Sequence, residues 1–278
     1  MKKYLALFLT MVMSVGVLAG CGGKEEPAAT DGADTAERTT FTVGFDAEYP
    51  PYGYKNDAGE YVGFDLDLAQ EVCDRNGWEL VKQPLDWGSK DMELNGGTVD
   101  CLWNGFTMTG REDKYTFSKP YVDNSIVFVV RQDSDIQTKA DLAGKTVITQ
   151  AGSSALAALT DTEDNEENLA LTASFASLEQ TPDYNSAFMS LETGAVDAIA
   201  VDIGVAQYQL SNHGDKFRQL EEPLSTEQYA IAFKLGNEEL RDQVQATLDE
   251  MLADGTFDKI AANYADYNLD QMVCLGKE

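Results

Sequence analysis

The sequence is poor in the residues from which metal centres and hydrolase triads are built. It contains one histidine, His213, in 278 residues. A zinc site or a Ser-His-Asp triad therefore has too few ligands or bases to draw on. The segment QAGSSAL (150–156) does not match G-x-S-x-G, and the sequence contains no glycine-rich phosphate loop with its lysine. We expect neither a metal nor a cofactor, and interpret His213 as a residue of a helix's last turn before Gly214.

Cysteine is also scarce. The four cysteines include no C-x-x-C pair, which excludes a disulfide scaffold. Beyond Cys21, the residues Cys73, Cys101 and Cys274 can form at most one disulfide, and the sequence does not decide the pairing. Cys73 and Cys101 lie in apolar patterns, so we interpret both as buried thiols.

Basic residues are few: 20 Lys and Arg stand against 48 Asp and Glu, for a formal net charge of −28. Such a surface repels nucleic acid and anionic headgroups, which makes both unsuitable partners. The acidic stretch DTEDNEENLALT (161–172) has the length of a calcium loop. It has Glu166 where that loop needs glycine and Thr172 where it needs glutamate, so we interpret it as a solvated loop or a helix start.

The first residues match a secretory signal. Lys2 and Lys3 precede an apolar run that ends in LAGC (18–21). LAGC resembles the lipobox of bacterial lipoproteins, which predicts a signal peptide over 1–20 and acylation of Cys21; the alternative is a non-lipidated signal cleaved nearby. Residues 21–39 are rich in Gly, Ala, Thr and acids and should form a flexible tether. We expect an extracytoplasmic protein that contacts the membrane through its lipid anchor only.

The remainder contains an internal repeat. LNGGTVDCLWN (94–104) and LETGAVDAIAVD (191–202) share Leu-x-x-Gly-x-Val-Asp before an apolar strand, 97 residues apart. Each is preceded by a short strand that runs into a polar loop, FTVGFDAEYPP (41–51) and KTVITQAGSSA (145–155). This order predicts an α/β fold with two Rossmann-like lobes and largely parallel sheets.

Two apolar segments, 124–132 and 227–235, have no counterpart in the repeat. We interpret them as crossover strands between the lobes. The first lobe then becomes discontinuous, with residues 40–127 and 229–278, and the second spans 128–228.

Ligands of open α/β sheets bind beyond the carboxyl ends of the strands. This rule collects Asp46 and Tyr49, the segment 104–111, the segment 150–154 with Gln150, and Asp202. Arg111 can bind a carboxylate through two hydrogen bonds, and Ser153 and Ser154 can share it at a helix start. Asp202 can bind an ammonium group. A small molecule that carries both groups is an α-amino acid.

Seven motifs in order carry a family resemblance over about residues 39–270: VGFDAEYPPYGY, GEYVGFDLDLAQEV, GFTMTGRE, YTFSKPY, DLAGKTVITQAGSS, GAVDAIAVD and the segment from YAIAFKLGNEE to KIAANY. Together they resemble the polar amino acid-binding proteins that serve bacterial ABC importers, with the type II periplasmic-binding-protein fold. The resemblance implies two lobes that close over an amino acid, an ABC permease as the partner, and no catalysis. We expect a monomer.

The resemblance also implies roles for single residues. Arg111 with Ser153 or Ser154 would bind the α-carboxylate, and Asp202 with Thr107 and the Gly105 carbonyl would bind the α-ammonium. The side chain would be surrounded by Asp46, Tyr49, Trp87 and Asn104. In one respect the sequence departs from the family pattern: only Gly110 separates Thr109 from Arg111, where the family usually has two residues. The alternatives are a turn-forming Asp46, core positions for Tyr49 and Trp87, and an Arg111 paired with Glu112 or Asp113.

With Asp46, two aromatic rings, one amide and no lysine expected near the ligand's side chain, we predict a polar neutral or basic ligand. Glutamine or a similar side chain is preferred over arginine or lysine. Two other functions stay open. A relative of this fold can act as a cyclohexadienyl or arogenate dehydratase, with Asp46 or Glu48 as the acid, and a tethered binding protein can present its ligand to a sensory receptor.

Overall fold

The computed structural model describes residues 38–162 and 165–277. The expected signal peptide, Cys21 and nearly all of the expected tether lie outside the described residues. No helix in the described ranges has both the length and the apolar character that a membrane span requires.

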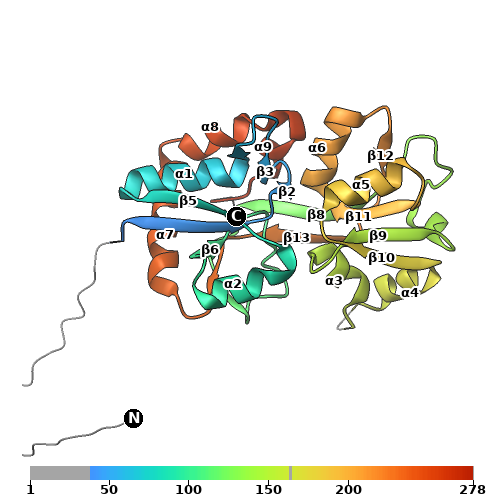
Figure 1. Ribbon diagram of the computed structural model, residues 1–278, viewed down its shortest axis with the longest axis horizontal. Helices are drawn as coiled ribbons and strands as arrows, with labels where there is room; N and C mark the ends of the chain where they lie inside the picture. The colour runs from blue at the N-terminus through green and yellow to red at the C-terminus, as the bar shows by residue number, and fades with distance from the viewer. Residues whose placement is uncertain (1–37, 163–164, 278) are drawn as a thin grey trace, which may run out of the picture. The chain divides into compact units, whose positions relative to one another are not determined.

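The strands form two large sheets and one small one, with helices around them (Figure 1). The first sheet has the order β5 (Glu79–Pro84), β1 (Thr40–Phe45), β6 (Cys101–Leu102), β14 (Ala232–Lys234), β7 (Tyr115–Phe117). The second has the order β10 (Ser177–Thr181), β9 (Thr146–Gln150), β11 (Ala198–Asp202), β8 (Val122–Arg131), β12 (Phe217–Gln219), and β13 (Ser225–Tyr229) also pairs with β8. A third, small sheet contains β2 (Glu48–Tyr49), β3 (Gly53–Lys55) and β4 (Tyr61–Val62). The two large sheets confirm the predicted two-lobed α/β fold.

Both large sheets are parallel where the repeat predicts it. β1 pairs in parallel with β5 and β6, and β9 with β10 and β11. The partners added by the crossover segments are antiparallel: β8 beside β11, and β14 beside β6. The chain enters the second sheet between β7 and β8 and returns between β13 and β14. The predicted segment 227–235 is thus two strands, one in each sheet, and the expected limits 127 and 228 fall inside β8 and β13.

The helices lie between the strands along the chain. They are α1 (Phe64–Asn76), α2 (Lys90–Gly96), α3 (Ser154–Thr160), α4 (Glu166–Ser174), α5 (Tyr184–Glu192), α6 (Ile203–His213), α7 (Glu238–Ala253), α8 (Thr256–Ala262) and α9 (Leu269–Met272), with 3-10 turns at Trp87–Ser89, Lys139–Leu142 and Ala265–Tyr267. α1 ends where Gly77 adopts a left-handed conformation, with φ of 70°. His213 is the last residue of α6, and α4 starts inside the acidic stretch, as predicted.

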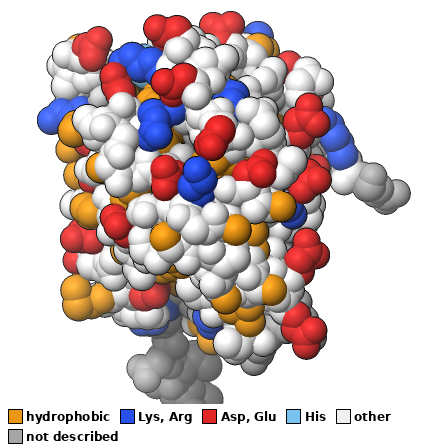
Figure 2. All heavy atoms as spheres, turned by 90° about the vertical axis from the view of Figure 1, so that its right-hand side faces the viewer, with side chains coloured by type: hydrophobic (Ala, Val, Ile, Leu, Met, Phe, Trp, Pro, Cys, Tyr) orange, Lys and Arg blue, Asp and Glu red, His pale blue; other side chains and the backbone are white. Residues whose placement is uncertain are grey.

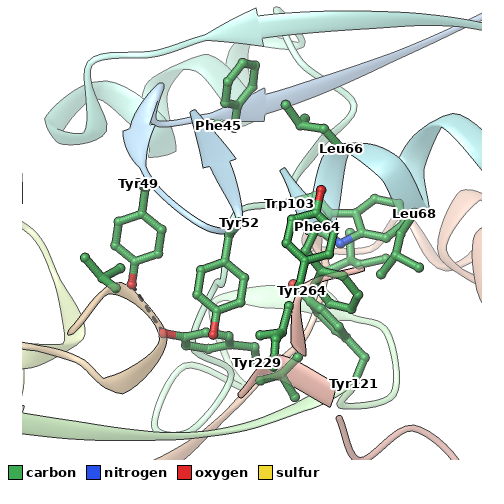
Figure 3. Close-up of a cluster of buried hydrophobic side chains, with 14 of the residues drawn as sticks. Phe45, Tyr49, Tyr52, Phe64, Leu66, Leu68, Trp103, Tyr121, Tyr229 and Tyr264 are labelled. Carbon is green, nitrogen blue, oxygen red and sulfur yellow. Dashed lines mark hydrogen bonds between the residues drawn. The ribbon is translucent and has the colours of Figure 1, made fainter. Parts of the chain in front are cut away.

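Apolar side chains from both lobes form one extended core that reaches their junction. In Figure 3, Tyr49 and Tyr52 of the small sheet's segment point toward Tyr229 at the end of β13, where the chain crosses between the sheets. Cys73, Cys101 and Cys274 are buried free thiols. Figure 2 shows acidic side chains spread over the end of the second lobe, interspersed with Lys and Arg.

Candidate binding site

A small cavity lies where the strand ends of the two lobes meet. It is lined by Tyr49, Trp87, Gly105, Phe106, Thr107, Arg111, Gln150, Ser153, Ser154 and Asp202. Nine of the eleven predicted ligand-binding residues are in this set; Asp46 and Asn104 are not. Phe106 also lines the cavity although it was not predicted as a ligand-binding residue. The sequence indicated its position only through the predicted neighbours Gly105 and Thr107 in the segment 104–111. The structure thus brings together residues from 49 to 202 around one cavity.

Strand geometry explains this convergence. Asp46, Gln150 and Asp202 stand at the carboxyl ends of β1, β9 and β11, which are parallel within their sheets. Parallel strands end at the same edge of their sheet, and the two edges face one another across the junction. The hydrogen bond from Gln150 Nε2 to Asp46 Oδ2, 2.6 Å long, joins the two lobes directly.

Asp202 is buried and surrounded by neutral donors. Its Oδ1 accepts a hydrogen bond from the Tyr229 hydroxyl at 2.5 Å and from Asn124 Nδ2 at 2.8 Å. The Tyr49 hydroxyl lies 3.2 Å from that of Tyr229 (Figure 3). Burial raises the pKa of Asp202 because the charged form loses its water, although these donors partly oppose the rise. The geometry supplies hydrogen bonds to the carboxylate but no positive charge.

Glu227, on β13, lies beside this site, and sequence reasoning missed it. Its Oε1 accepts hydrogen bonds from Thr107 Oγ1 at 2.7 Å, Asn124 Nδ2 at 2.8 Å and Ser154 Oγ at 3.0 Å. Removal from water, and then the charge of Asp202, raise its pKa to about 7. In a strand pattern, Glu227 reads as an outward polar residue. Its place in the site depends on its hydrogen-bond donors, which come from segments more than 70 residues away in the sequence.

Arg111 reaches the cavity through a tight turn. Its backbone N–H donates to Met108 O at 2.9 Å, and Gly110 has φ of 76°. That conformation suits glycine at the third position of a type II turn. The guanidinium lies over the Phe106 ring, 5.0 Å from its centroid. Across the described ranges, Arg111 forms no ion pair with Glu112, Asp113 or another carboxylate.

Asp46 and Asn104 form a second layer behind the cavity. The Asp46 backbone N–H donates to Asn104 Oδ1 at 3.0 Å, and Asp46 Oδ1 accepts from the Glu48 N–H at 2.8 Å. Asp46 is therefore a turn-forming aspartate and also the partner of Gln150. Burial raises its pKa to about 6. Asn104 Nδ2 is buried and has no partner among the described residues.

Lys90 is a cation that the sequence did not predict here. Its side chain is buried, and Nζ donates to Trp87 O and Gly152 O, both at 3.3 Å. It lies 5.2 Å from the Trp87 ring centroid. Burial lowers its pKa. Lys90 does not itself line the cavity, but α2 begins at Lys90 beside the lining residue Trp87, and its Nζ reaches the loop at Gly152 of the second lobe.

The two serines differ in what their hydroxyls can offer. Ser153 caps α3: its Oγ accepts from the Leu156 N–H at 3.1 Å and donates to Gln150 O at 2.7 Å. Ser154 Oγ instead donates to Glu227 at 3.0 Å. Each hydroxyl therefore already donates its one proton within the protein, Ser153 to its own loop and Ser154 to Glu227, and only Ser154 could turn to a ligand without breaking a helix cap.

Gly105 is positioned from behind by Asp65. The Gly105 N–H donates to Asp65 Oδ2 at 2.6 Å, and the Tyr121 hydroxyl donates to Asp65 Oδ1 at 2.9 Å. Gly105 has φ of 56°, and a Cβ there would lie 2.9 Å from Tyr229 Cε2. Only glycine fits this close approach of the backbone to the cavity.

Two α/β lobes, joined by two chain crossings and enclosing a polar cavity between their strand ends, define a two-lobed solute-binding protein. The chain belongs to the bacterial extracellular solute-binding proteins, family 3, whose sequence model matches residues 41–267. The fold is the type II fold of periplasmic amino acid-binding proteins, as the sequence resemblance implied.

Three known proteins illustrate the similarity. The L-cystine-binding protein TcyA of Bacillus subtilis (strain 168) is 32% identical over 277 residues, which cover 95% of this chain and 97% of that protein. An ABC uptake transporter substrate-binding protein from Streptococcus pneumoniae with bound histidine has a TM-score of 0.76 and 33% identity, over 81% of this chain and 92% of that one. An ancestral arginine-binding protein bound to glutamine has a TM-score of 0.72 and 33% identity, over 82% of this chain and 98% of that one.

Proposed function

We propose that this protein captures an amino acid between its two lobes and delivers it to an ABC importer in the membrane. One observation carries the proposal: the site contains uncompensated charges of both signs. Asp202 and Glu227 form no ion pair with a lysine or arginine of the described chain, and Arg111 forms none with a carboxylate. Uncompensated charges away from water are costly. An α-amino acid brings an ammonium and a carboxylate that match them.

In this proposal, Arg111 and Ser154 bind the α-carboxylate, assisted by the backbone around Ser153. Asp202, Thr107 and the Gly105 carbonyl bind the α-ammonium. The ligand's side chain lies toward Tyr49, Trp87 and Gln150, and Asp46 with Asn104 acts through the layer behind. These roles are those that the family resemblance implies, and the cavity lining and the hydrogen bond between the lobes support them.

Lys90 alters the expected side-chain preference. If Asp46 were the only charge near the ligand's side chain, that part of the site would favour neutral or cationic side chains. With Asp46 and Lys90 both present, it also suits a polar group that carries both signs or neither. We therefore keep polar neutral and basic amino acids as the ligand class and place L-cystine, whose distal half is itself a zwitterion, beside glutamine. The relatives named for cystine and histidine support this range.

The test is a thermal-shift screen of the purified protein over the twenty amino acids and L-cystine, followed by calorimetric titration of the hits. A ligand that binds only the folded state raises the melting temperature by mass action. We expect shifts with a few polar amino acids and none with leucine. A chain that binds none of them, or that turns arogenate or prephenate into product, would contradict the proposal.

Asp46→Asn is predicted to separate ligands by charge. The amide keeps an acceptor and the size of the side chain but removes the negative charge beside Gln150. We expect a cationic ligand such as arginine to lose about 1–2 kcal/mol of binding free energy and glutamine to lose little, because Asp46 acts from behind the cavity through its charge, and one charge about 8–16 Å away at an effective dielectric constant of about 20 contributes about 1–2 kcal/mol. Titration of both ligands against both proteins measures the difference. Equal losses would remove Asp46 from side-chain recognition.

The anchor is also a prediction. We propose that the mature protein begins at an acylated Cys21, on the basis of LAGC and the apolar run before it. Mass spectrometry of membrane-extracted protein should show an N-terminal lipid-modified Cys21 peptide. Cys21→Ser should release the protein from the membrane without changing its ligand affinity. An unmodified mature N-terminus elsewhere would contradict the prediction.

A further inference from the structure

Asp202 and Glu227 are close enough to share one donor. Asn124 Nδ2 donates to Oδ1 of Asp202 and to Oε1 of Glu227, at 2.8 Å in both cases. Two carboxylates held this close, with no cation paired to either in the part of the chain that the structure describes, cannot both carry a charge cheaply. The pair has two ways to reduce its charge: it can bind a proton or it can bind a cation.

We propose that Glu227 is a second carboxylate of the ammonium site, that the Asp202–Glu227 pair shares one proton while the site is empty, and that the ligand's ammonium group displaces this proton. The inference rests on the proposed function, because it needs a ligand with an ammonium group. The step is balanced: the singly protonated pair and the ligand cation give the doubly ionised pair with the bound cation, plus one proton in solution.

The placement of Glu227 supports this role. It stands on β13, one of the two segments by which the chain crosses between the lobes, and accepts from Thr107 of the first lobe and Ser154 of the second. Thr107 and Ser154 also line the cavity. Glu227 does not itself line the cavity, but two of its donors do, and it shares Asn124 with Asp202, so a cation bound beside Asp202 lies close to it.

The tyrosine hydroxyls around the pair do not titrate in competition with it. Tyr49, Tyr52, Tyr184 and Tyr229 face the pair, and burial raises all four pKa values above their usual range, so these hydroxyls stay neutral up to pH 9. Burial also raises the pKa of Asp46 to about 6 and that of Asp65 to about 7, and it lowers the pKa of Lys90. Asp46 contacts Gln150 and Asp65 contacts Gly105, not the pair, so these two carboxylates are the groups to control.

The sign of the pH dependence follows. At pH 6 the empty pair holds its proton, and the ligand must displace it. As the pH rises toward 8, less of the empty protein is protonated, so affinity should increase by up to about tenfold per pH unit and then level off. If Asp202 were ionised throughout and Glu227 took no part, the affinity would change less between pH 6 and pH 8.

The experiment is isothermal titration calorimetry at pH 7 in phosphate, HEPES and imidazole buffers, whose ionisation enthalpies differ. The probe is L-glutamine or L-arginine, whichever gives the larger thermal shift, since neither titrates between pH 6 and 8. For the wild type, the dependence of the observed heat on the buffer should show release of about half to one proton. Glu227→Gln keeps an oxygen that can accept from Thr107 and Ser154. At pH 7 this variant should release less than about 0.2 proton per ligand bound, and its loss of affinity relative to the wild type should be largest at pH 8. Asp46→Asn and Asp65→Asn remove the two other buried carboxylates of the site region and should each release about as much proton as the wild type. Glu239→Gln removes an exposed carboxylate that does not line the cavity and is the matched control.

The outcomes are distinct. Measurable binding without proton release by the wild type would overturn the inference and leave the proposed function standing. The inference would also be overturned if Asp46→Asn no longer released a proton on ligand binding while Glu227→Gln still did. If no amino acid binds, the proposed function itself is wrong. If Glu227→Gln does not fold, as judged by circular dichroism, the wild type and Asp46→Asn still decide the result.

Discussion

Arg111→Ala is expected to weaken amino-acid binding by about 30-fold or more. The guanidinium lies over the Phe106 ring at the cavity edge and has no carboxylate partner among the described residues. Its loss would leave the ligand's carboxylate dry and unpaired. Truncating one partner of a buried charge pair costs about 2–5 kcal/mol or more. A micromolar complex has about −8 kcal/mol of binding free energy, so the dissociation constant would rise to between about 30 μM and several millimolar.

Asp202→Asn should have an effect of the same size at the other end of the ligand. The amide keeps an oxygen for the Tyr229 hydroxyl, so the local structure should persist while the negative charge is lost. Lys114→Ala is the matched control for Arg111→Ala, because Lys114 is an exposed cation in the same region that does not line the cavity. Calorimetric titration of all three variants with the tightest-binding amino acid gives the comparison. Wild-type affinity in Arg111→Ala would mean that the shortened spacing after Thr109 has moved the carboxylate site to another residue.

Gly204→Ala is expected to weaken binding about 10- to 100-fold without unfolding either lobe. Gly204 is the second residue of α6 in the second lobe, and a Cβ there would lie 2.3 Å from the Tyr52 hydroxyl oxygen and 2.8 Å from two of its ring carbons. Tyr52 belongs to the first lobe and cannot move aside, because its buried ring packs against Tyr49 and Tyr229. Overpacking typically costs about 1–3 kcal/mol. The added methyl group should oppose closure of the lobes and so reduce the fraction of the protein that can bind.

Gly96→Ala is the matched control for this prediction. Gly96 is also helical, and a Cβ there meets nothing within 4 Å. Small-angle scattering with saturating ligand should show less compaction for Gly204→Ala than for Gly96→Ala or the wild type. Tyr52→Phe removes the oxygen nearest to the added methyl group and should restore part of the affinity. Equal affinity and compaction in both glycine variants would show that this contact does not limit closure.

The elements themselves were largely predictable from local pattern. The strands at 40–45 and 146–150 were predicted from the repeated strand-and-loop order, and His213 was placed in the last turn of a helix, where it lies. The segment 227–235 was the main misreading. Its middle, from Tyr229 to Phe233, is apolar and reads as one strand, but Ala230 and Ile231 fall between β13 and β14, because the chain leaves one sheet for the other there. Periodicity reports that a segment is buried and does not report which sheet it joins.

Some residues of the site could be predicted from the sequence and others could not. Arg111, Asp202 and Tyr49 could be selected from sequence because each follows a predicted strand end, and strand ends of parallel sheets meet at one edge. Glu227 and Lys90 could not, since their surroundings come from distant segments. Asn124, Thr107 and Ser154 converge on one Glu227 oxygen, and Lys90 contacts Gly152 of the other lobe.

The sequence by itself therefore determined the class of the protein: a repeated β-loop-α order, two crossover segments, and charged residues of both signs after the strands. These depend on near neighbours in the chain and on rules that hold for any open α/β sheet. Only the tertiary structure decided the electrostatic balance of the site. Whether a carboxylate such as Glu227 is solvated or is held without a cation beside Asp202 depends on which distant side chains surround it, and folding alone brings those side chains together.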